Sequence, residues 1–85
     1  MGDPEVLKAM YKEVMENQIR DNTPPETSIT FQRLQDAGIA KEEATNMILD
    51  CIQINIFDAF KSGEAEKANK DYISNLKNLP NSPFE

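Results

Sequence analysis

Proline and glycine divide this chain into four segments, and that division constrains the fold more than any other feature of the sequence. The breaks lie at Pro24-Pro25, Gly38, Gly63 and Pro80. Proline interrupts a helix from within, and glycine at a helix end adopts a left-handed conformation that most other residues avoid. The breaks therefore predict helices at about 4–21, 25–37, 41–62 and 65–79, followed by a tail at 80–85.

Apolar residues recur every three or four positions within these segments, which is the spacing of one face of a helix. In the first segment they are Leu7, Met10, Tyr11, Val14, Met15 and Ile19. Asp3-Pro4 is a typical start for this helix, with an N-cap followed by proline. The third segment, 41–62, is apolar around more than half of its circumference and should be the most buried helix. The sequence thus predicts an all-α protein with one domain, residues 1–85, folded as a compact bundle of four helices with a short second and a central third helix.

Two segments allow a second interpretation. The run Cys51–Phe57 alternates isoleucine with polar residues, as a half-buried strand does. We favour a helix there, because the chain holds no second strand-like run to pair with it. The last helix begins either directly after Gly63 or at Asn69, with 64–68 then forming a loop. Whether Phe84 of the tail packs on the bundle is left open.

The charge balance argues against nucleic-acid and anionic membrane partners. Fifteen acidic residues and nine basic ones give a net charge of −6, and no two basic residues are adjacent. Binding to phosphates needs clustered lysine and arginine, which this sequence lacks. Polar residues interrupt every apolar stretch, so no membrane span is expected, and the start Met1-Gly2-Asp3 is unlike a signal peptide. We therefore expect a cytoplasmic protein without nucleic-acid or membrane partners.

The sequence lacks the residues that carry most enzyme and metal chemistry. It contains no histidine and one cysteine, which excludes the commonest general base, a zinc site of several thiolates and an internal disulfide. Cys51 lies in the most apolar segment, where a small buried side chain is the expected role. Three carboxylate pairs are expected to be solvated acidic surface. They are Glu13 and Glu16, Glu42 and Glu43, and Asp50 and Asp58. No catalytic residue, metal site or cofactor is predicted.

Two amides interrupt the apolar third segment and mark a candidate interface. Gln53 and Asn55 lie among apolar residues, where a buried amide needs a hydrogen-bond partner. They either face solvent at the edge of the helix or belong to a polar seam at an interface. Together with Phe57 and Phe60 they form the candidate interface. The core is expected to include Met10, Met15, Met47, Phe31, Phe57 and Phe60, with an adaptable binding groove formed by them as the alternative.

Two further segments, 24–38 and 43–48, carry distinctive motifs. The motifs are Pro24-Pro25-Glu26, then Phe31-Gln32-Arg33-Leu34 and Gly38, and finally Glu43-Ala44 through Met47-Ile48. Over roughly residues 12–60 the chain resembles a group of small all-helical prokaryotic proteins of unknown function. In that group the first helix carries two histidines four residues apart, and the third helix opens with Ser-Arg-His-Glu-Ala-x-His.

The resemblance implies a metal or proton site shared by two helices of that group. Aligned on the common motifs, the four histidine positions fall on Lys12, Glu16, Glu42 and Asn46, so every histidine is replaced in this chain. A lysine, two carboxylates and an amide are a poor set of zinc ligands. These four residues form a candidate polar cluster, in which we expect Lys12 and Glu42 to form an ion pair.

These observations favour a non-catalytic role. Four short helices leave part of the apolar third segment uncovered, and small domains are often stabilised by association. We therefore expect a protein-interaction or self-associating module, with a protein partner or a homodimer. The alternative is a carboxylate-based binder of a small ligand or a divalent cation, or a small enzyme. It would use Glu13, Glu16, Glu42 or Asp50.

Overall fold

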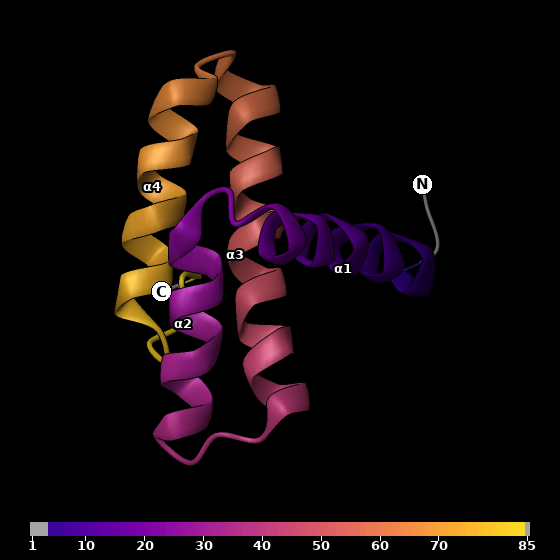
Figure 1. Cartoon of the computed structure of the whole chain (residues 1–85). Coiled ribbons are helices and arrows are strands. Elements are labelled where there is room, and N and C mark those ends of the chain that lie inside the picture. The colour runs from indigo at the N-terminus through magenta and orange to yellow at the C-terminus, as the bar shows by residue number, and fades with distance from the viewer. Residues whose placement is uncertain (1–3, 85) are drawn as a thin grey trace.

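The computed structural model describes residues 4–84 and shows an all-α fold of four helices (Figure 1). The helices are α1 (Pro4–Asp21), α2 (Pro25–Asp36), α3 (Lys41–Ser62) and α4 (Ala65–Asn78). Each begins at the predicted residue, and α2 and α4 end one residue earlier than predicted. Within residues 4–84 no strand is present, so the run Cys51–Phe57 is helical, as predicted. The predicted N-cap Asp3 and the last tail residue, Glu85, lie outside the described residues.

The helix ends follow the breaks that the sequence predicts. Asn22, Gly38 and Gly63 have left-handed φ angles of 52°, 93° and 72°. Glycine adopts this conformation without a Cβ clash, and asparagine tolerates it better than most residues. The Gly63 N–H donates to the Ala59 carbonyl oxygen at 3.0 Å, which satisfies one of the last carbonyls of α3. Helix α4 begins at Ala65, so the alternative loop before it is excluded.

Helix α3 is the centre of the bundle and packs against each of the other three helices. Figure 1 shows α3 running opposite to α2 and α4, while α1 crosses α3 near its middle. The buried core is Met15, Leu34, Ala44, Ile48, Leu49, Cys51, Ile52, Tyr72, Leu76 and Leu79. The predicted central position of the third helix is thus confirmed. In the tail, the Phe84 side chain is 59% exposed, so it does not pack into the core.

A hydrogen-bond network of the buried residues Thr27 and Tyr72 and the half-buried Gln18 joins α1, α2 and α4. Tyr72 Oη donates to Gln18 Oε1 at 2.7 Å, and Thr27 Oγ1 lies 2.8 Å from the same oxygen and 3.0 Å from Tyr72 Oη. Leaving a buried polar group without a partner costs about 1–3 kcal/mol, so each member depends on the others. Burial raises the pKa of Tyr72 to about 12, although the hydrogen bond with Thr27 acts in the opposite direction. The phenol therefore stays protonated at neutral pH.

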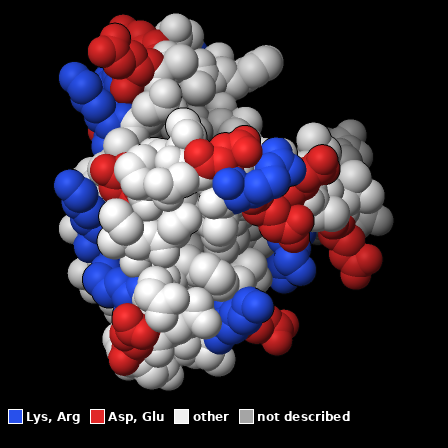
Figure 2. All heavy atoms as spheres, viewed as in Figure 1, with Lys and Arg blue, Asp and Glu red and all other residues white. Residues whose placement is uncertain are grey.

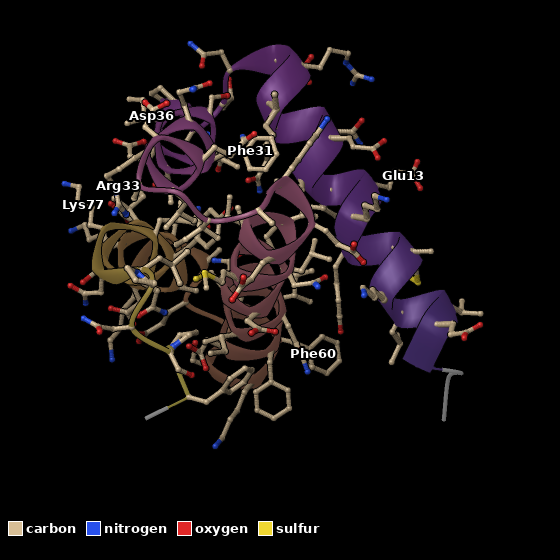
Figure 3. The ribbon with its side chains drawn as sticks, turned by 90° about the horizontal axis from the view of Figure 1, so that it is seen from below. Glu13, Phe31, Arg33, Asp36, Phe60 and Lys77 are labelled. Atoms are coloured by element: carbon tan, nitrogen blue, oxygen red, sulfur yellow. The ribbon has the colours of Figure 1, made fainter. Side chains whose placement is uncertain are left out.

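Arg33 of α2 is bound to the C-terminal end of α4. Its Nη1 donates to the Leu79 carbonyl oxygen at 2.9 Å, and its Nη2 donates to the Leu76 carbonyl oxygen at 3.0 Å. The last carbonyls of a helix have no partner within the helix, and a cation there also complements the negative end of the helix dipole. Figure 3 shows Arg33 between α2 and α4. Arg33 therefore stabilises both the end of α4 and its packing on α2.

Replacing Tyr72 by phenylalanine (Tyr72→Phe) should lower the free energy of unfolding by about 1–2 kcal/mol at pH 8, because it removes the donor to Gln18. The pKa of Tyr72 is raised from 10.0 to about 12 on folding. Its contribution is therefore complete below pH 10 and is lost as the pH rises toward 12. Urea unfolding should give a smaller difference between the two proteins at pH 11 than at pH 8.

Tyr11→Phe is the matched control, because the Tyr11 hydroxyl forms no hydrogen bond within the described residues. We expect it to change stability by less than about 0.5 kcal/mol at either pH. Equal losses for the two tyrosine variants at pH 8 would contradict the role of the network.

The substitution Arg33→Met keeps the aliphatic stem and removes both hydrogen bonds to α4. We expect it to lower the free energy of unfolding by about 1 kcal/mol and to speed amide hydrogen exchange in the last turn of α4. Lys77→Met is the control, because Lys77 lies in that turn and is exposed. If both variants exchange alike, the hydrogen bonds of Arg33 do not stabilise this helix end.

Candidate functional site

A groove of about 630 Å³ runs between α1 and α3 and contains all four residues of the predicted polar cluster. Its walls are Lys8, Lys12, Met15, Glu16 and Ile19 from α1, Phe31 from α2, and Lys41, Glu42, Thr45, Asn46 and Leu49 from α3. The structure thus brings together polar-cluster residues that are up to 34 positions apart in the chain, Lys12 and Asn46.

Helical spacing explains why these side chains meet. The two cluster residues on α1 are four positions apart, as are the two on α3, and residues four apart share one face of a helix. Because α1 crosses α3, the two faces oppose each other across the groove (Figure 1). Met15 and Leu49 are buried and form its apolar floor. Phe31 points in from α2, as Figure 3 shows.

The groove carries charges of both signs. Lys8, Lys12 and Lys41 bring three positive charges, and Glu16 and Glu42 bring two negative ones. The predicted ion pair between Lys12 and Glu42 is wrong, because these residues lie on different walls of an open groove and form no salt bridge. Among the described residues, no group of three or more His, Cys, Asp and Glu side chains could hold a metal ion. Three ammonium groups beside two carboxylates also disfavour a cation here.

A smaller hollow of about 330 Å³ shares a wall with the groove. It is lined by Leu7, Lys8 and Tyr11 from α1 and by Asn46, Leu49, Asp50 and Gln53 from α3. Burial raises the pKa of Asp50, while the positive charge of Lys8 acts in the opposite direction. The hollow marks the place where α1 ceases to cover the face of α3.

Beyond the hollow, apolar side chains of α1 and α3 face solvent. This apolar surface consists of Val6, Leu7, Met10, Ile56, Phe57 and Phe60. Phe57 is 65% exposed and Phe60 is 92% exposed, and Figure 3 shows Phe60 projecting from α3 away from α2. The α1 and α3 parts lie on either side of the hollow, because Leu7 and Gln53 line it from opposite helices and Phe57 follows Gln53 by one helical turn.

The structure separates the four residues of the candidate interface. Gln53, Phe57 and Phe60 share one face of α3, because they are spaced four and three residues apart. Asn55 faces α4 instead, where its Nδ2 donates to Asn69 Oδ1 at 3.2 Å. Asn55 therefore belongs to the contact between α3 and α4, and the other three belong to the open face.

Sequence reasoning missed the α1 part of the apolar surface. Leu7 and Met10 belong to the predicted apolar stripe, yet they are 37% and 55% exposed, and Val6 is 56% exposed. The stripe is continuous along α1, but the helix crosses α3, so only its later residues, such as Met15, reach the core. Apolar spacing identifies a helix face and carries no information about how far a neighbouring helix covers it.

The thiol of Cys51 is buried, and Asp50 and Asp58 of the predicted carboxylate pairs are half-buried. Burial, assisted by the charge of Asp50, raises the pKa of the Cys51 thiol to about 12. At neutral pH this thiol is protonated and is a poor nucleophile. The glutamates of the predicted pairs are exposed, and Figure 3 shows Glu13 pointing away from the bundle. Exposed carboxylates of this kind form a solvated acidic surface.

Charges of both signs are interspersed on the face of the molecule shown in Figure 2. Within residues 4–84, no helix has both the length and the apolar character that a membrane crossing requires. No protein-family model matches the chain, and neither a curated protein nor a solved structure matches it. The groove, the hollow and the apolar surface are therefore the features from which a function can be inferred.

The thiol of Cys51 should be inert in the folded protein. With a pKa of about 12, only about one thiol in 10⁴ is ionised at pH 8. We expect Ellman's reagent to react at least a hundredfold faster in 6 M guanidinium chloride than with the native chain. The variant Phe60→Cys is the control, since its added thiol is exposed and should react at once. Rapid reaction of the native wild-type chain would contradict this assignment.

Proposed function

We propose that this chain is a non-catalytic protein-binding module whose contact region is the apolar surface of α1 and α3. The observation that carries the proposal is the exposure of two phenylalanines on one helix face, Phe57 and Phe60. Moving a phenylalanine side chain from water to a buried site contributes about 1.5–3 kcal/mol. We place the protein in the cytoplasm, because a small chain with a single buried thiol suits a reducing compartment.

The grouping of these side chains supports the proposal more than the exposure of any single one. Isolated exposed hydrophobic residues are common on monomers, and Ile29 of α2, which is 63% exposed, is such a case. Contiguous apolar patches with polar residues around them are typical of interaction sites. Aromatic residues also contribute much of the binding energy in protein interfaces.

The groove supports a second candidate function, the binding of a small ligand. Its volume of about 630 Å³ lies within the range of ligand sites, and its floor is apolar. Its three lysines favour an anionic group over a divalent cation. The four positions that align with the histidines of the small helical prokaryotic proteins, Lys12, Glu16, Glu42 and Asn46, all line this groove. Under this alternative, decanoate at millimolar concentration should raise the melting temperature, and Mg²⁺ should not.

Photo-crosslinking tests the protein-binding function. The benzophenone amino acid p-benzoylphenylalanine replaces Phe57 in one variant and Ile29 in a matched control, and both are irradiated in cells that produce the protein. We expect a covalent protein adduct at position 57, because an interface residue lies against its partner. We expect none at position 29, which is equally exposed but lies outside the apolar surface.

Mass spectrometry of the adduct then identifies the cross-linked chain. No adduct at position 57, or an identical set of adducts at both positions, would contradict the proposed function.

A further inference from the structure

We infer that the partner of the apolar surface is a second copy of this chain, bound about a two-fold axis near Phe57 with each Phe60 ring in the hollow of the other copy. The inference rests on the proposed function, because it names the occupant of the same surface. The exposed area, the register of α3 and the distribution of charge support it.

The exposed area of the chain exceeds that of a compact monomer by about one side of a dimer interface. A monomer of 9.6 kDa typically exposes about 5,100 Å². This chain exposes 5860 Å², an excess of about 760 Å². A stable protein interface of standard size buries about 800 Å² on each partner. The excess is thus close to the area that one partner buries in such an interface.

The open face of α3 is complementary to itself. In a two-fold interface the same patch serves both partners, so residue i meets residue j and residue j meets residue i. If two α3 helices pair antiparallel about a point between Ile56 and Phe57, then Phe60 of one copy lies opposite Gln53 of the other. Gln53 forms one wall of the hollow, and Leu7 and Leu49 give that hollow apolar walls. The most exposed aromatic ring thus faces a hollow whose apolar walls are Leu7, Tyr11 and Leu49 and whose other walls are Lys8, Asn46, Asp50 and Gln53.

The charges near the apolar surface allow two like-charged copies to meet. The chain carries a net charge of −6, but residues 4–11 and residues 53–62 each contain one acidic and one basic side chain. A strongly charged partner would be matched by a surface of the opposite sign. A near-neutral surface fits a second copy instead. The antiparallel register also brings Lys61, the neighbour of Phe60, towards Asp50 in the hollow of the other copy.

Sedimentation equilibrium of the whole chain tests the inference. As the concentration rises to 1 mM, we expect the wild-type mass to approach twice the monomer mass of 9.6 kDa. The double variant Phe57→Ser/Phe60→Ser should dimerise at least tenfold more weakly. Ile29→Ser should match the wild type, because Ile29 is as exposed as Phe57 but lies on α2. Far-UV circular dichroism checks that each variant keeps its helices, as expected for exposed positions.

A wild-type chain that stays at 9.6 kDa up to 1 mM overturns the inference. A double variant that dimerises as tightly as the wild type overturns it too. In both cases the proposed function still stands if the cross-link at position 57 joins a different protein. Absence of any cross-link removes the proposed function as well.

Disulfide trapping tests the position of the two-fold axis. The variant Phe57→Cys places a thiol near the axis, and mild oxidation should link two copies through position 57. Cys51 does not compete, because it is buried and its pKa is about 12. Ile29→Cys reports the rate of random collisions, and we expect at least tenfold slower linkage there. Equal rates in the two variants would overturn the proposed axis.

Discussion

The buried hydrogen bonds among Gln18, Thr27 and Tyr72 determine how α1 sits on the rest of the molecule. The Gln18 side-chain oxygen is reached from both α2 and α4, so the C-terminal part of α1 is held at one point between those helices. Separating the three groups would leave the buried hydroxyls of Thr27 and Tyr72 without partners, which is costly. With that end held, α1 crosses α3 instead of lying along it (Figure 1). The groove, the hollow and the apolar surface are all consequences of that crossing.

The crossing divides one face of α3 into a covered half and an open half. Over the covered half, α1 supplies Lys8, Lys12 and Glu16 to the groove, opposite Lys41 and Glu42 of α3. Over the open half, the same face continues through Gln53 to Phe57 and Phe60 with no helix against it in the described structure. An 18-residue helix is about 27 Å long and would cover most of α3 if the two were aligned. The exposed aromatic side chains therefore follow from the packing direction of α1.

Local signals were sufficient to predict the helices, and tertiary geometry decided the rest. Proline and glycine act within one turn of their own position, so the segment bounds at Pro25, Gly38 and Gly63 could be predicted from the sequence. The exposure of Met10 and the bond from Asn55 to α4 depend on the crossing of α1 and on the rotation of α3, and no local pattern encodes these. The resemblance to a known group of proteins predicted that the four polar residues of the groove lie together. It did not predict that the groove would carry lysines and glutamates that form no salt bridge with one another; only the structure shows this.

The net charge of −6 opposes association between copies of the chain, whereas the near-neutral apolar surface promotes it. Exposed phenylalanines promote indiscriminate contact, and a domain of this size has little stability to spare. Net charge opposes contact between copies wherever charged surfaces meet. A region of little net charge escapes that repulsion, and residues 53–62 around Phe57 and Phe60 carry one acidic and one basic side chain. Repulsion over the rest of the molecule would therefore restrict self-association to one geometry. A second copy bound at this surface would also raise the free energy of unfolding, because it would bind the folded chain and not the unfolded chain.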